Sequence, residues 1–134
     1  MRDNKPILLV EDDQVDAMTV QRAMVDLRVT NPLEIAGDGE QALAYLRQPG
    51  KEHPGLILLD LNMPRMGGLE FLEIVKQDAL LRRIPVVVLT TSNEERDRID
   101  AYDLSVAGYI VKPVDYRKFV ETVRAIDLYW TLCE

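Results

Sequence analysis

The sequence is poor in the residues that build disulfides, thiolate metal sites and membrane segments. It contains one cysteine, Cys133, and one histidine, His53. A single thiol cannot form an internal disulfide or a thiolate metal site, which fits a reducing compartment, and His53 in its turn-rich segment is interpreted as a solvated loop residue. No apolar run approaches the length that spans a bilayer, and no signal-peptide core follows the first five residues. We therefore predict a cytoplasmic protein without a membrane segment.

Basic residues are also in short supply. The formal net charge is −7, and no basic run is longer than Arg82-Arg83. A nucleic-acid-binding surface needs basic residues to neutralise phosphates, so we predict no contact with nucleic acid. The length of 134 residues, with 47% hydrophobic residues, suits one globular domain with a sizeable core. We expect a single domain over residues 1–134.

What the sequence does contain is a set of apolar, strand-like runs that end in polar residues. They are 6–10, followed by Glu11, Asp12 and Asp13; 56–59, followed by Asp60; 84–89, followed by Thr90; and 107–111, followed by Lys112. Runs this apolar are typical of strands buried on both faces, as in parallel sheets. In such sheets chemistry gathers outside the carboxyl ends of the strands, so these polar groups are expected to share one edge.

Segments with helical spacing separate the strand-like runs. A short second strand is predicted at 33–36, and the helices are expected to begin after Asp13, Asp38, Gly67-Gly68, Ser92 (with Glu95 in a capping pattern) and at Asp115. Strand and helix thus alternate five times. This alternation predicts an α/β protein with a five-stranded, doubly wound parallel sheet of flavodoxin-like order 2-1-3-4-5.

The strand ends predict a metal-assisted phosphoryl site. If Glu11, Asp12 and Asp60 lie close together, each like-charge pair costs about 3 kcal/mol at an effective dielectric of 20. Oxygen ligands without imidazole or thiolate favour a hard divalent cation, and Mg²⁺ suits carboxylates with several waters. With the Thr90 hydroxyl and the Lys112 ammonium, the set could receive a phosphoryl group on Asp60.

Each of these residues also has a purely structural interpretation. Acids after a strand often cap the next helix, which is the favoured interpretation of Asp13. Thr90 could simply finish a strand, and Lys112 could be a surface charge at a turn. The joint pattern of acid pair, acid, hydroxyl and lysine, in that order along the chain, is what favours a site.

The sequence resembles the receiver domain of two-component response regulators over about residues 5–127. The matching pieces are Leu8-Leu9-Val10-Glu11-Asp12, Leu58-Leu59-Asp60-Leu61-Asn62-Met63-Pro64, Val88-Leu89-Thr90-Thr91-Ser92 and Tyr109-Ile110-Val111-Lys112-Pro113. The resemblance implies that Asp60 accepts a phosphoryl group from a phosphohistidine on a sensor kinase. It also implies a signalling protein that catalyses only its own phosphorylation and dephosphorylation.

The resemblance assigns further roles by position. Asp12 and Asp60 would bind Mg²⁺ directly, Glu11 would act mostly through water, and the backbone carbonyl of Asn62 would complete the protein ligands. The implied switch pair is Thr90, whose hydroxyl moves to the phosphoryl group, and Tyr109, whose ring turns inward. Lys112, followed by Pro113, which is usually cis in the family, would contact the phosphoryl oxygens.

The sequence departs from the family pattern at two places. Gly67 stands where the family commonly has Asp, which removes a cap from the third helix. Glu11 replaces the commoner Asp, a frequent family variant.

The resemblance also suggests how the signal leaves the protein. A receiver without an attached effector signals by binding, and the polar segment 92–104 is expected to shift. The apolar residues at 128–132 would either fold back on the core or form part of a self-association surface, and we favour a homodimer through the last helix and strand. This tail, with 80–85 and 89–92, is similar to the small stand-alone regulators paired with bacterial phytochromes. A red-light sensor kinase is the expected partner, and other histidine kinases fit the residues equally well.

Two other classes of protein share part of the pattern. A haloacid-dehalogenase-like phosphatase also places a nucleophilic Asp at a strand end, but it needs a second acid where this chain has Asn62. A flavodoxin-like flavin protein needs a phosphate-cradling loop after the first strand, where Glu11, Asp12 and Asp13 would repel a phosphate. Both alternatives are disfavoured.

Overall fold

The computed structural model describes residues 4–63, 65–91, 93–112 and 115–133, with the backbone alone for 129–133. Five parallel strands form one sheet in the order β2-β1-β3-β4-β5. The strands are β1 (Ile7–Val10), β2 (Leu33–Ala36), β3 (Leu56–Leu59), β4 (Val86–Thr90) and β5 (Gly108–Val111). The predicted fold class and strand order are confirmed.

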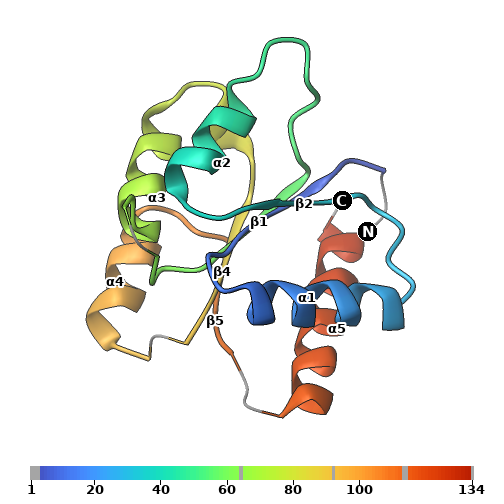
Figure 1. The fold of residues 1–134 in the computed structure, drawn as a ribbon. Coiled ribbons are helices and arrows are strands. Elements are labelled where there is room, and N and C mark those ends of the chain that lie inside the picture. Colours follow the sequence, from blue (N-terminus) through green and yellow to red (C-terminus); the bar gives the residue numbers. More distant parts are fainter. Residues whose placement is uncertain (1–3, 64, 92, 113–114, 134) are drawn as a thin grey trace.

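Helices cover both faces of the sheet. They are α1 (Gln14–Asp26), α2 (Gly39–Leu46), α3 (Gly68–Gln77), α4 (Glu95–Asp103) and α5 (Tyr116–Cys133), with a short 3₁₀ helix η1 (Leu81–Arg83) before β4. Helices α1 and α5 lie on one face, and α2, α3 and α4 lie on the other (Figure 1). The sheet is therefore the middle layer of three.

Alternate strand residues feed two separate cores. Leu8 and Val10 pack into the core with α2, α3 and α4, whereas Ile7 and Leu9 pack into the core with α1 and α5. All four β1 residues are buried because side chains alternate across a strand and both faces are covered. This explains why the strands appear in the sequence as unbroken apolar runs.

Aspartate side chains cap α1 and α2, the helices that follow β1 and β2. Asp13 accepts hydrogen bonds from the backbone N–H groups of Val15 (2.8 Å) and Asp16 (3.1 Å), and Asp38 accepts one from Gln41 (2.9 Å). These caps satisfy N–H groups that have no partner inside the helix. Gly67 occupies the cap position of α3 and makes no side-chain cap hydrogen bond.

Helix α4 differs from its prediction. It begins at Glu95 with Glu94 in the cap position, so Glu95 is not the third residue of a helix capped by Ser92, which itself lies outside the described residues. Two of its large apolar residues, Ile99 and Tyr102, are about half exposed. Ala101 is the buried residue of this helix, so α4 rests on the core through a small side chain.

The C-terminal segment 128–132 belongs to α5, whose backbone stays helical to Cys133. It therefore continues this helix, and the choice between packing on the core and a self-association surface stays a prediction. Within the described part of the chain, none of the helices has the length and apolar character that a membrane crossing requires.

Candidate functional site

The acidic residues of the two central strands meet at the carboxyl edge of the sheet. Val10 pairs with Leu59, and the backbone N–H of Asp60 donates to the carbonyl of Val10 at 3.0 Å. Glu11 and Asp60 therefore leave neighbouring strands at the same level. Carboxylate oxygens of Glu11, Asp12 and Asp60 all lie within 4.8 Å of one another. We call these three residues the acidic cluster.

Burial makes this cluster electrostatically costly. Glu11 and Asp60 are buried, and Asp12 is exposed, which leaves one side of the cluster open to solvent. Burial raises the pKa of Glu11 to about 7; the hydrogen bond from Lys112 opposes this rise, and the nearby charge of Asp60 adds to it. A carboxyl with such a pKa binds a cation or a proton readily at neutral pH.

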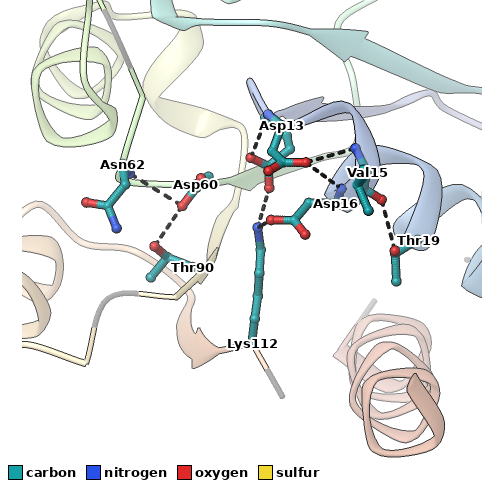
Figure 2. A network of polar contacts seen from close by, with 9 residues as sticks. Asp13, Val15, Asp16, Thr19, Asp60, Asn62, Thr90 and Lys112 are labelled. Carbon is teal, nitrogen blue, oxygen red and sulfur yellow. Dashed lines mark hydrogen bonds and ion pairs between the residues drawn. The ribbon is translucent and has the colours of Figure 1, made fainter. Parts of the chain in front are cut away.

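Lys112 supplies the compensating positive charge. Its ammonium donates to a carboxylate oxygen of Glu11 and to Asp16 Oδ2, the latter at 3.0 Å (Figure 2). Burial alone would lower the pKa of Lys112, but the hydrogen bond and charge of Glu11, with Asp60 and Asp16, raise it above its ordinary value. The resemblance implies that Lys112 contacts the phosphoryl oxygens. In this structure its partners are the carboxylates of Glu11 and Asp16.

Asp16 is a site residue that the sequence reasoning missed. The strand-end pattern did not include it, whereas its carboxylate binds Lys112, 96 residues away in the chain. Its position held a signal, because Asp16 lies in the first turn of a helix that starts directly after β1. An acidic side chain in that turn lies near the strand ends.

Asp60 is held by two donors from different elements. The hydroxyl of Thr90 donates to Asp60 Oδ1 at 2.7 Å, and the backbone N–H of Asn62 reaches the same oxygen at 3.4 Å (Figure 2). Thr90 is fully buried at the end of β4. The predicted hydroxyl and the predicted carboxylate therefore touch each other directly.

Tyr109 lies one strand further along the sheet. Its side chain is half-buried against the core of α2, α3 and α4, and the guanidinium of Arg98 lies 5.8 Å from its ring centre. Arg98 in turn donates to Asn93 at 3.1 Å. Pro113, for which a cis bond is expected, lies outside the described residues.

The donor set of the acidic cluster suits a hard divalent cation. All three side chains offer carboxylate oxygens, and the cluster concentrates negative charge at a partly open edge. Such oxygen donors favour Mg²⁺, Mn²⁺ or Ca²⁺ over metals that prefer nitrogen or sulfur ligands. The arrangement can therefore hold a cation beside a carboxylate that is hydrogen-bonded to a hydroxyl.

Comparison with protein families gives one decisive match. Residues 7–124 match the model of the response regulator receiver domain. The chain belongs to this family. As a receiver domain it is a signalling protein, and this family match favours the receiver interpretation over the phosphatase and flavin-protein alternatives.

Several receivers are similar to this chain over most of its length. Response regulator Rcp1 of Synechocystis sp. is 42% identical over 130 residues, which cover 94% of this chain and 88% of Rcp1. The phosphorylated cyanobacterial phytochrome response regulator RcpA has a TM-score of 0.88 at 42% identity, covering 96% of this chain and 94% of RcpA. The Mn²⁺-bound form of Rcp1 has a TM-score of 0.86 at 42% identity, covering 95% of this chain and 94% of that Rcp1 chain. These similarities extend beyond the site to the whole sheet and its helices.

Proposed function

We propose that this receiver accepts a phosphoryl group on Asp60 from the phosphohistidine of a sensor kinase and so switches a protein-binding surface. The observation that carries the proposal is the meeting of Asp60 with Glu11, Asp12 and the Thr90 hydroxyl at one edge of the sheet. A carboxylate oxygen of Asp60 would attack phosphorus as the bond between phosphorus and imidazole nitrogen breaks. With a proton on its other nitrogen, the imidazole leaves neutral.

We propose Mg²⁺ as the resident cation, bound by Asp12, Asp60 and the backbone carbonyl of Asn62, with Glu11 acting through water. The donor set and the raised pKa of Glu11 support a divalent cation at this place. When bound, Mg²⁺ would neutralise the charge on the phosphoryl oxygens. The Mn²⁺ bound to Rcp1, a receiver of similar sequence, is compatible with a cation of this class.

The remaining residues have proposed roles that follow from their contacts. Thr90, which donates to Asp60, would transfer its hydrogen bond to the phosphoryl group, and Tyr109 would move into the space that Thr90 leaves. Lys112 would exchange a carboxylate partner for a phosphoryl oxygen. We propose that catalysis by this protein is limited to its own phosphorylation and dephosphorylation.

We propose a sensor histidine kinase of the phytochrome type as the partner. The support is the similarity to RcpA, described as a phytochrome response regulator. Phosphotransfer profiling against candidate kinases tests this, and preferred transfer from a kinase without a light-sensing domain would contradict it.

The cytoplasmic location stays a prediction, as does one receiver domain over residues 1–134 with its core at about 5–127.

We also propose a homodimer through α5 and β5. β5 is an edge strand, and a shallow hollow beside it is lined by apolar residues that include Ile110 and Ala125. Leu128, one turn beyond Ala125 on α5, is 58% exposed. An exposed edge strand next to an apolar helix face favours association between chains.

Phosphorylation is tested directly by mass. With acetyl phosphate and Mg²⁺, the intact mass should rise by one phosphoryl group, and Asp60→Asn should abolish the gain because it replaces the nucleophilic carboxylate by an uncharged amide. Asp13→Asn is the matched control: it makes the same change two residues from Glu11, and Asn caps a helix as well as Asp does. Phosphorylation that survives Asp60→Asn would place the nucleophile elsewhere.

A further inference from the structure

The loop after Asp60 is tied to the loop before α2 by one ion pair. The β3–α3 loop, whose described residues are 61–63 and 65–67, carries Asn62. Its Arg65 places Nη1 3.3 Å from Asp38 Oδ2. The side chain of Asp38 is only 4% exposed, whereas that of Arg65 is 67% exposed. A carboxylate buried to this degree needs compensating partners, and Arg65 is one of them.

The backbone of Arg65 adopts a conformation that is unfavourable for a residue with a side chain. Its φ is 61°, in the left-handed region that glycine adopts more easily. A non-glycine residue there costs about 1–3 kcal/mol. The pair with Asp38 is a contact that glycine at this position could not make.

Asp38 is a rigid anchor because it also caps α2. Its Oδ1 accepts the N–H of Gln41 at 2.9 Å, while Oδ2 faces Arg65. The two loops also touch through Gly39: a Cβ on this glycine would lie 2.7 Å from the side chain of Met66. The two loops are thus also in close contact directly after the ion pair.

We propose that the Asp38–Arg65 pair positions the β3–α3 loop, and with it the backbone carbonyl of Asn62, beside the acidic cluster. Asp38 and Arg65 are then positioning residues for cation binding, although neither belongs to the acidic cluster. This inference rests on the proposed function, since it assigns a task to the Asn62 carbonyl. The N–H of Asn62 already reaches Asp60, so a shift of this loop would disturb Asp60 as well.

Three variants isolate the pair. Arg65→Gly removes the guanidinium and relieves the backbone strain, so the fold should survive. Asp38→Asn removes the charge and keeps a good cap for α2. The double variant shows whether the two residues act together. Arg28→Gly is the control, because Arg28 has the same backbone conformation, with φ 58°, and lies just after α1 near the opposite edge of the sheet.

Two measurements follow the loop and the cation separately. Amide hydrogen exchange of residues 61–63 and 65–67 without metal should be faster in both single variants and unchanged in Arg28→Gly. Calorimetric titration with Mg²⁺ should give a dissociation constant raised about tenfold in each single variant. The double variant should bind Mg²⁺ no more weakly than the weaker-binding single variant, because both changes break the same contact. Arg65→Lys, which keeps the charge, should restore part of the affinity.

A purely electrostatic effect has a different signature. Removing the positive charge of Arg65 would strengthen Mg²⁺ binding, and removing the negative charge of Asp38 would weaken it. Opposite changes of Mg²⁺ affinity in the two single variants would therefore overturn the proposal. Losses of affinity that add up in the double variant would also overturn it. So would unchanged hydrogen exchange in the loop, or a wild-type protein that does not bind Mg²⁺. Failure of Asp60 to accept a phosphoryl group would contradict the proposed function alone, because exchange and Mg²⁺ affinity do not depend on phosphorylation.

Discussion

Glu11 carries a carboxylate where a full negative charge is unfavourable. It is 3% exposed, lies beside Asp60 and has a pKa of about 7, against an ordinary value of 4.5. The folded protein therefore holds a proton on Glu11 between pH 4.5 and 7, while the unfolded chain has released it. Since the folded state binds more protons in this window, its stability must fall as the pH rises from 4.5 to 7.

This linkage gives a prediction for the metal-free protein. With a chelator present, the free energy of unfolding of the wild type should decrease as the pH rises from 4.5 to 7. Relative to Glu11→Gln, which cannot titrate at this position, the decrease should reach up to about 3 kcal/mol. Lys112, whose pKa is raised from 10.5, titrates well above this window. Urea denaturation of both proteins at several pH values measures the difference. Parallel stability curves for the two proteins would mean that Glu11 ionises normally.

Gly68, at the first residue of α3, shows how closely an element packs behind the site. A Cβ on Gly68 would lie 2.5 Å from the backbone oxygen of Asp60 and 2.6 Å from the Cα of Leu61. Both are backbone atoms, so the start of α3 or the strand end at Asp60 would have to move. The glycine therefore allows α3 to begin directly against the backbone of Asp60 and Leu61.

Neighbouring glycines provide a matched test of this packing. Gly68→Ala should lower the free energy of unfolding by about 1–3 kcal/mol because it overpacks a rigid backbone contact. Gly67→Ala should change it by less than about 0.5 kcal/mol, since its Cβ would meet only the Leu61 oxygen at 3.8 Å and its φ is −69°. Thermal or chemical denaturation of both variants measures the contrast. Equal losses would show that the close approach at Gly68 is relaxed without cost.

At the level of elements, the sequence predicted what local rules decide. The strands β1, β2 and β3 and the caps at Asp13 and Asp38 follow from side-chain alternation and from hydrogen bonding within four residues. Helix α4 began later than predicted, because Ser and Glu at capping spacing do not force a helix to start. Strand β4 also began two residues later, at Val86, since the N–H of Ile84 closes the 3₁₀ helix by donating to Leu81.

At the level of the whole molecule, the parallel sheet allowed the site to be anticipated. Once the strand order is known, Glu11, Asp60, Thr90 and Lys112 must leave the sheet at one edge, although up to 101 residues separate them. Their partners could not be predicted, because an ion pair such as Lys112 with Asp16 depends on how a helix is rotated over the sheet. Asp38 with Arg65 likewise depends on two loop conformations, one of them with a positive φ that arginine rarely adopts.

The proposed dimer provides a test at the same scale. An isologous dimer buries Leu128 twice, and burying a leucine contributes about 1.5–3 kcal/mol. Leu128→Glu should therefore raise the dimer dissociation constant about a hundredfold or more. Leu80→Glu is the matched control: Leu80 is 64% exposed just before η1, outside α5 and β5. Light scattering over a range of concentrations, with and without phosphorylation, should give a dimer for the wild type and for Leu80→Glu and a monomer for Leu128→Glu. Dissociation caused by Leu80→Glu alone would move the interface away from α5 and β5.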